Sequence, residues 1–119
     1  MDIVRYFKLQ NKGGFVAQIE VEYKKKNTDT SGNVSYDAEW NSWKPSGYHD
    51  ICVHAERTVD LCSDAKIPEG SQVRLRAVVK GGKDKTSDQY VYQQASPNTA
   101  SYKISGTTLI NSLTLCSFG

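Results

Sequence analysis

The strongest constraint on the fold is a strict alternation of apolar and polar residues in two separate runs of the chain. In the first run, Gly14–Tyr23, apolar side chains occupy every second position, and Gln18, Glu20 and Glu22 lie between them. The second run, Gln72–Val79, repeats the pattern with two arginines among its polar residues. Because successive side chains of a β-strand point to opposite faces, a period of two predicts strands with one buried and one solvated face.

Weaker runs of the same kind, separated by turn residues, continue over the rest of the chain. No stretch shows a helical period, and Gly, Pro, Asn and Asp cluster between the runs. The sequence therefore predicts about eight strands in an all-β sandwich or barrel, formed by a single domain over residues 1–119. The six weaker strands are expected at Ile3–Gln10, Val34–Trp40, Ile51–Leu61, Asp88–Tyr92, Ala100–Ile104 and Thr108–Cys116.

Composition excludes several classes of function. With 38% apolar and 24% charged residues, the chain of 119 residues has the composition of a folded globular protein. Its formal net charge of +2 is too small to indicate a nucleic-acid partner. No apolar run has the length needed to span a bilayer, and Met1–Gln10 lacks the apolar segment of a signal peptide. The cellular location therefore stays open: the protein is secreted by another route, resides inside the cell, or has a leader outside this sequence.

Catalytic and metal-binding patterns are not evident in the sequence. The three cysteines, Cys52, Cys62 and Cys116, are an odd number without the spacing of a metal site, and buried thiols in strands are the favoured interpretation. His49 and His54 are five residues apart, which does not suit a zinc pair on one helical face. We therefore expect no enzymatic activity, no metal and no cofactor; a small hydrolase that uses one of the histidines is the least favoured alternative.

The direction of the chain predicts which loops lie together. If every strand crosses the sandwich once, successive turns alternate between its two ends, and one end receives 11–14, 42–50, 80–87 and 105–107. Loops held by a rigid scaffold are where sandwiches commonly bind their partners, so this end is the expected binding surface. Aromatic, basic and hydroxyl groups gather there: Lys12, Phe15, Trp43, Tyr48, His49, Lys80, Lys83, Lys85, Thr108 and Leu109.

Several segments, in order, resemble the C-terminal membrane-binding domain of the cholesterol-dependent (thiol-activated) cytolysins. Gly13–Val21 is similar to the Gly-aromatic-Val-Ala-Gln strand that opens this domain in the family. Ile67–Ala77 is similar to its strand of alternating apolar and basic residues, and Ile104–Leu109 to its Gly-Thr-Thr-Leu segment. Asp29–Trp40 also looks like a polar turn and following Trp of the family. Together these segments cover nearly all of the chain.

The resemblance implies a β-sandwich of two roughly four-stranded antiparallel sheets, with the loops at one end meeting a membrane. In the family, an adjacent Thr-Leu pair recognises sterol, and Thr108-Leu109 match it. The alternative is that a Thr-Leu pair opens an ordinary strand and Leu109 faces the core. The ligand expected is membrane lipid, either sterol or an anionic headgroup that attracts lysines. The expected lipid-binding residues are Thr108, Leu109, Phe15, Gly14, Lys80, Lys83 and Lys85.

The sequence also departs from the family. Val78–Thr86 carries no Trp and no Cys where the family has a Trp-rich, Cys-containing loop, so a basic hairpin replaces the aromatic anchor. The expected function is that of a toxin- or defence-related binding module. Whether the chain forms a homo-oligomer through exposed sheet edges stays open. The alternative is a lectin-like, carbohydrate-binding protein on the same scaffold, in which Trp43, Tyr48 and His49 stack on and hydrogen-bond a sugar.

Overall fold

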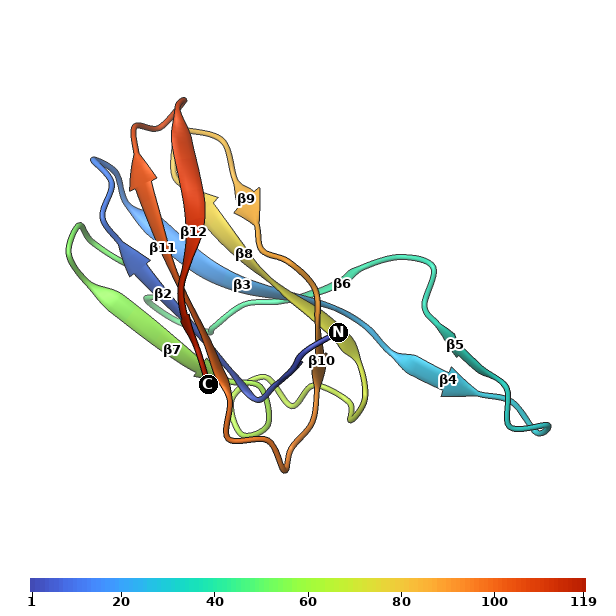
Figure 1. Ribbon diagram of the computed structural model, residues 1–119. Coiled ribbons are helices and arrows are strands. Elements are labelled where there is room, and N and C mark those ends of the chain that lie inside the picture. Colours follow the sequence, from blue (N-terminus) through green and yellow to red (C-terminus); the bar gives the residue numbers. More distant parts are fainter.

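The computed structural model describes residues 1–119 as two β-sheets packed face to face, with a two-stranded hairpin that projects from one end (Figure 1). The expected all-β sandwich is confirmed, and the chain contains no helix. The strands are β1 (Ile3–Val4), β2 (Tyr6–Asn11), β3 (Ala17–Lys24), β4 (Lys26–Thr28), β5 (Val34–Tyr36), β6 (Asn41–Trp43), β7 (Glu56–Asp60), β8 (Gln72–Val79), β9 (Lys85–Thr86), β10 (Tyr90–Tyr92), β11 (Thr99–Gly106) and β12 (Asn111–Phe118).

The two runs with the clearest alternation form the centre of the first sheet. Strands β3 and β8 pair antiparallel over eight residues, from Ala17 opposite Val79 to Lys24 opposite Gln72. Their buried positions alternate as the sequence predicts, and they contribute to a core of 20 buried apolar residues. Period-two burial therefore explains why these segments are strands, since only that conformation places every second side chain in one core.

Both sheets are mixed, which differs from the expected antiparallel pairing. The first sheet has six strands in the order β1-β10-β8-β3-β6, with β9 beside β8, and the second has four in the order β12-β11-β2-β7. Two segments cross from the first sheet to the second: β1 continues into β2 after Arg5, and β10 continues into β11. They run in the same direction, so β1 pairs with β10, and β2 with β11, in parallel.

Two other expected strands are placed differently. Val34–Trp40 was expected in the sandwich, but β5 pairs with β4 in the projecting hairpin (Figure 1). The residues of β4 are all exposed polar residues, so this pair has no apolar face to bury in the core. The position at the edge of the first sheet is taken by β6, which pairs with β3. Only Glu56–Asp60 of the expected strand Ile51–Leu61 is regular, although Ile51 forms a single bridge with Ala17.

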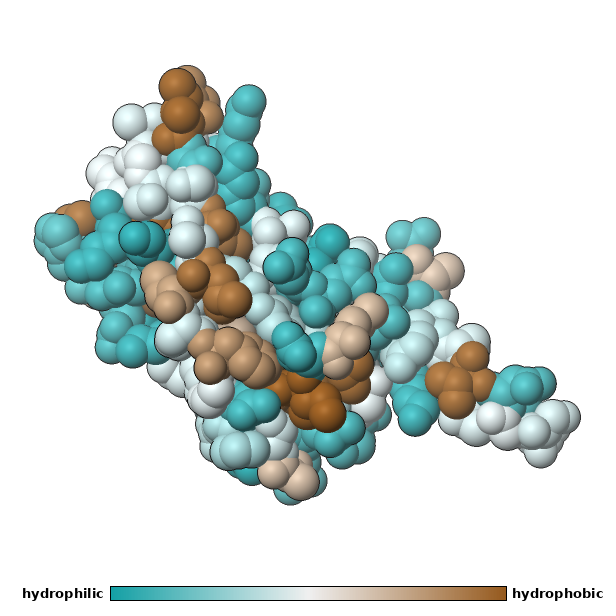
Figure 2. Space-filling model, viewed as in Figure 1, coloured by the Kyte–Doolittle hydropathy of each residue, from teal (hydrophilic) through white to brown (hydrophobic).

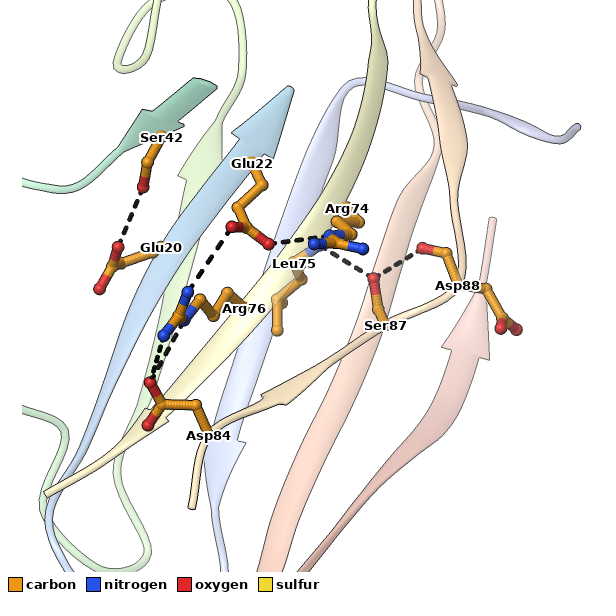
Figure 3. Close-up of polar contacts among 9 residues, drawn as sticks. All are labelled: Glu20, Glu22, Ser42, Arg74, Leu75, Arg76, Asp84, Ser87 and Asp88. Carbon is orange, nitrogen blue, oxygen red and sulfur yellow. Dashed lines mark hydrogen bonds and ion pairs between the residues drawn. The ribbon is translucent and has the colours of Figure 1, made fainter. Parts of the chain in front are cut away.

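The outer face of the first sheet carries an ionic network (Figure 3). Glu22 is only 7% exposed, and its carboxylate accepts a hydrogen bond from Arg74 Nε at 2.8 Å. Its second oxygen lies 3.6 Å from Arg76 Nη1, and Arg76 Nη2 reaches Asp84 at 2.7 Å. Two guanidinium groups thus compensate the buried carboxylate, as a charge taken out of water requires. Through Asp84, the network fixes the loop that follows β8.

Candidate functional site

Four loop segments meet at one end of the sandwich, which we call the tip. It comprises residues 12–16 between β2 and β3, 48–51 of the β6–β7 loop, 80–84 between β8 and β9, and 107–110 between β11 and β12. Figure 1 shows the β2–β3, β8–β9 and β11–β12 loops at the end opposite the β10–β11 loop. The structure therefore gathers three of the four loops that the direction of the chain predicts for one end, whereas of the segment 42–50 only the last residues reach the tip and Trp43 and Ser46 lie at the side of the sandwich.

Hydrogen bonds between main chains join these loops. Gly14 N donates to Gly106 O at 3.1 Å, which ties the β2–β3 loop to the end of β11. Lys83 N donates to Thr108 O at 3.0 Å, and Asn111 Nδ2 donates to Lys83 O at 3.0 Å. These bonds connect residues far apart in the sequence, so the tip is one hydrogen-bonded unit.

The β11–β12 turn presents an apolar pair to solvent. Gly106 enters the turn at a φ of 105°, a conformation that residues with a Cβ rarely adopt. Thr107 closes the turn, since its N–H donates to Ile110 O at 2.7 Å and its Oγ1 accepts from Ile110 N at 3.1 Å. The Leu109 and Ile110 side chains are 65% and 82% exposed. The alternative in which Leu109 faces the core is wrong, because Thr108 and Leu109 lie in the turn and β12 begins only at Asn111.

The β8–β9 loop is shaped by Asp84. One of its carboxylate oxygens accepts from Val79 N at 3.0 Å, while the other binds the Arg76 guanidinium shown in Figure 3. This arrangement presses Gly82 against the main chain of Thr108, where a Cβ atom would overlap the Thr108 carbonyl group. Glycine at position 82 is therefore required for the two loops to approach this closely.

Lys80 is neutralised within the tip. Its Nζ lies 3.0 Å from Asp50 Oδ1, and Gln18 Nε2 donates to the same carboxylate at 2.6 Å. The Gln18 amide and the Lys80 ammonium hold the pKa of Asp50 below its ordinary value. This carboxylate also joins the β6–β7 loop to the rest of the tip, so Lys80 serves the architecture of the tip as well as its charge.

The other predicted lysines make no ion pair. Lys83 is exposed beside the apolar turn, and Lys12 is exposed in the β2–β3 loop. Lys85 lies on β9 opposite Ala77 and is half-buried. The tip thus carries positive charge close to an exposed apolar pair, a combination that suits an anionic membrane surface.

Two residues of the tip differ from the expectation. Phe15 was expected at the contact surface, but its side chain is only 9% exposed and belongs to the core. The ring lies against Gly13 and is not available for insertion into a lipid layer; Gly14 beside it is exposed. Ile110 was not among the contact residues expected from the sequence; the only indication of its exposure was its position next to Leu109 in a turn. Ile110 is the more exposed of the two.

The three residues expected to bind a sugar do not line one surface. Trp43 is half-buried and lines a cavity at the side of the sandwich, to which neither Tyr48 nor His49 contributes. The Tyr48 ring is 80% exposed, and His49 Nδ1 lies 2.7 Å from Gly47 O. His54, the other histidine considered for hydrolysis, is exposed and donates its main-chain N–H to Asn11 O.

The cysteines also differ from the expected buried thiols. Cys52 and Cys116 are exposed, Cys62 is half-buried, and all three are free. The structure contains no group of three His, Cys, Asp or Glu side chains placed to hold a metal ion. It likewise contains no helix with the length and apolar character to cross a bilayer.

Two solved structures of toxins several times longer than this chain share its fold. A structure described as a Gram-negative toxin matches with a TM-score of 0.50 at 17% identity, over 93% of this chain and 22% of that one. Intermedilysin bound to human CD59 matches with a TM-score of 0.50 at 18% identity, over 92% of this chain and 23% of the other. The chain therefore spans about a fifth of these toxins, and the likeness shows the fold.

A third solved structure, of the membrane-binding domain of pneumolysin, has a size similar to this chain. It matches with a TM-score of 0.44 at 16% identity, over 92% of both chains. No curated protein matches the sequence. The sequence model of the family described as the thiol-activated cytolysin beta sandwich domain matches residues 6–112, which is most of the chain. This chain therefore belongs to the thiol-activated cytolysin β-sandwich domain family.

Proposed function

We propose that this domain is a non-enzymatic module that binds lipid membranes through its tip. The observation that carries the proposal is the exposure of Leu109 and Ile110 on a turn held by hydrogen bonds from a neighbouring loop. Membership of the cytolysin β-sandwich family supports a module of this kind. A rigid turn loses little conformational entropy when it enters a membrane interface, so the burial of its apolar side chains favours binding directly.

The magnitudes favour shallow and reversible binding. Full burial of a Leu or Ile side chain is worth roughly 1.5–3 kcal/mol, and the interface buries only part of each. A lysine close to an anionic surface contributes about 1 kcal/mol, and Lys12 and Lys83 are exposed without ion pairs. Neither contribution is enough by itself for stable attachment, so we expect binding to need both apolar contact and negative surface charge.

Two lipid ligands fit this tip. Thr108 precedes Leu109 and its carbonyl oxygen accepts from Lys83 N, while its hydroxyl group is not used in the hydrogen bonds that build the turn, so this hydroxyl is free to bind the hydroxyl group of a sterol. The basic β8–β9 loop favours an anionic headgroup instead. Sterol recognition and headgroup recognition are distinguished by the lipid composition to which the domain responds.

Flotation with vesicles of four compositions tests the proposal. The vesicles contain phosphatidylcholine alone, with cholesterol, with phosphatidylserine, or with both lipids. Binding that requires cholesterol supports sterol recognition, and binding that requires phosphatidylserine and is lost in high salt supports headgroup recognition. A protein that remains at the bottom of all four gradients would overturn the proposed function.

We also infer that a second copy of this chain is the partner for the free edge of β12. This strand ends the order of the second sheet, so one of its edges has no neighbouring strand. Leu115 and Phe118 on it are 44% and 40% exposed, and Figure 2 shows apolar surface on the side where β12 lies. Asn111–Phe118 contains no charged residue and no proline, two of the devices that commonly protect an edge from pairing, and its one irregularity is a register shift opposite Ser101 and Tyr102. An uncharged strand is compatible with its own copy, and a two-fold pairing would continue the sheet.

Sedimentation over a range of protein concentrations tests this association. We expect a dimer at high concentration that Leu115→Lys abolishes, because a charge would be buried beside its own copy at the pairing edge. Val34→Lys is the matched control, since Val34 is an exposed apolar residue on the distant hairpin. A protein that stays monomeric at every concentration, or loss of the dimer with both variants, would contradict the inference.

A further inference from the structure

One arginine of the chain lacks the partner that the other three have. Arg57 makes no ion pair and no side-chain hydrogen bond, and it is half-buried. The remaining arginines each bind a carboxylate within 3.1 Å: Arg5 binds Asp60, Arg74 binds Glu22, and Arg76 binds Asp84. A half-buried guanidinium without a counter-charge is unusual, because its desolvation is not compensated within the protein.

Arg57 lies on the side of β7 that faces the core. Residues alternate along this strand, and Val59, two positions on, is 1% exposed in the core. Arg57 pairs across the sheet with Leu9, which is completely buried. The strand is at the edge of the second sheet, so its inner face at Arg57 opens sideways between the two sheets. The guanidinium therefore occupies the open margin of the sandwich.

A cavity of about 290 Å³ lies at this margin, between β7 and the end of β6. Arg57 and Trp43 line it from the two sheets, and Ser46, Ser63 and Asp64 complete its polar lining. Asp64 Oδ2 accepts from Asp60 N at 2.9 Å, which fixes the carboxylate and leaves its other oxygen free to accept a further bond. The volume is at the lower limit of ligand pockets, which run from about 300 to 1,000 Å³, so it suits a single small ring.

We propose that this cavity binds an acidic saccharide, a pyranose ring that carries a carboxylate. The planar guanidinium of Arg57 matches a carboxylate with two parallel hydrogen bonds. Ser46 and Ser63 can donate to or accept from the hydroxyl groups of the sugar, and the mostly polar lining of the cavity suits such a ligand. The free oxygen of Asp64, which forms no ion pair with Arg57, can accept a hydrogen bond from a sugar hydroxyl group. Of the three residues expected from the sequence to bind a sugar, Trp43 alone lines this cavity.

This cavity is separate from the tip. None of its lining residues belongs to the four tip segments. The saccharide site therefore does not depend on membrane binding, and either proposal can fail without the other. A variant of Arg57 should float with vesicles as the unaltered protein does.

Titration monitored by backbone amide resonances tests the site, with methyl β-D-glucuronide as the probe. We expect shifts confined to the cavity residues and an affinity at least tenfold higher than for methyl β-D-glucoside, which has the same ring without a carboxylate. Acetate is the third ligand and should bind at least tenfold more weakly than the glucuronide, because it lacks the hydroxyl groups that Ser46 and Ser63 would bind. Equal shifts with glucuronide and glucoside would overturn the proposal, and acetate binding as tightly as glucuronide would reduce the site to an anion site.

Variants assign the binding to Arg57. Arg57→Gln should weaken glucuronide binding at least tenfold and leave the weak glucoside response unchanged. Arg57→Lys keeps the positive charge but cannot form two parallel hydrogen bonds with a carboxylate. Its affinity for the glucuronide should therefore lie between those of the unaltered protein and Arg57→Gln, and it replaces the glutamine variant if that variant does not fold. Lys83→Gln, at the tip, is the matched control for general charge and should bind the glucuronide normally. Full binding by the Arg57 variants would contradict the assignment.

Discussion

The main-chain N–H of Lys83 donates a hydrogen bond to the carbonyl oxygen of Thr108 over 3.0 Å, and this bond joins two loops that are 25 positions apart in the sequence. The basic loop is thereby fixed beside the apolar turn, and both Lys83 and Leu109 are exposed to solvent. In the proposed membrane contact, the cation would meet the headgroup region and the apolar side chains the acyl region of one leaflet, so the two loops would act together.

The closeness of these two loops predicts a strong effect of Gly82→Ala. A methyl group would overlap the Thr108 carbonyl, and the loops would have to separate. Overpacking of this kind commonly costs about 1–3 kcal/mol, which lowers the melting temperature by roughly 3–5 °C for each kcal/mol in a chain of this size. Calorimetry measures the loss. Gly14→Ala is the control, since a methyl group there meets only an ordinary contact at 4.0 Å, and a Gly82 variant as stable as that control would contradict the close packing.

Replacement of both Leu109 and Ile110 by serine should weaken vesicle binding without destabilising the fold. Both side chains are mostly exposed, so their loss removes little from the core, and the melting temperature should change by less than about 2 °C. Partial burial of two apolar side chains in an interface predicts a loss of about 10- to 100-fold in the partition coefficient. The measurement is vesicle titration of the two proteins.

Val34→Ser is the matched control for the apolar pair. Val34 is 52% exposed on the hairpin formed by β4 and β5, away from the tip. Its substitution should leave the partition coefficient unchanged. An equal loss in the control and in the double variant would mean that apolar exposure in general, and not the tip, determines binding.

Lys83 and Lys80 should contribute unequally to binding of anionic vesicles. Lys83 makes no ion pair, so Lys83→Ala should reduce affinity about fivefold at low salt, as expected for about 1 kcal/mol. Lys80 is already paired with Asp50 at 3.0 Å, and Lys80→Ala should have a smaller effect. Titration at two salt concentrations provides the measurement, with Lys26→Ala on the hairpin as the control. A larger effect of Lys80 than of Lys83 would contradict the assignment of free charge to Lys83.

The pairing of Arg5 with Asp60 predicts how stability depends on pH. Burial opposes ionisation of Asp60, but two hydrogen bonds from Arg5 and one from the Cys62 N–H prevail and lower its pKa from 3.8 to about 2. Because the folded pKa lies below the ordinary one, the stabilisation is complete above about pH 4. It is lost as the pH falls towards 2.

Asp60→Asn should therefore lower the free energy of unfolding at pH 7 by about 1–2 kcal/mol, a value that allows for solvent screening. Its stability should also fall less steeply than that of the unaltered protein between pH 4 and pH 2. Urea unfolding at several pH values measures both effects. Asp88→Asn, at an exposed carboxyl without an ion pair, is the control. Identical pH profiles for the Asp60 variant and the unaltered protein would disprove the linkage.

Much of the fold was predictable from the sequence because alternation is a local signal. The pattern in Gly14–Tyr23 and Gln72–Val79 places one set of side chains on one face whatever the rest of the chain does, and β3 and β8 bear this out. The hairpin was not predictable in the same way. Val34–Tyr36 has the composition of a strand, but its place depends on the partner, and β4 offers no apolar face.

The sequence by itself determined that this chain is an all-β sandwich with a core drawn from alternating positions, since a period of two allows no other regular structure to bury those side chains together. Only the tertiary structure decided which residues of the loops face solvent. Phe15 keeps to the alternating pattern and is buried in the core. Leu109 and Ile110 are exposed instead, because Gly106 turns the chain before β12 begins. The unpaired state of Arg57 was likewise invisible in the sequence, because a missing ionic partner is a property of long-range contacts between sheets.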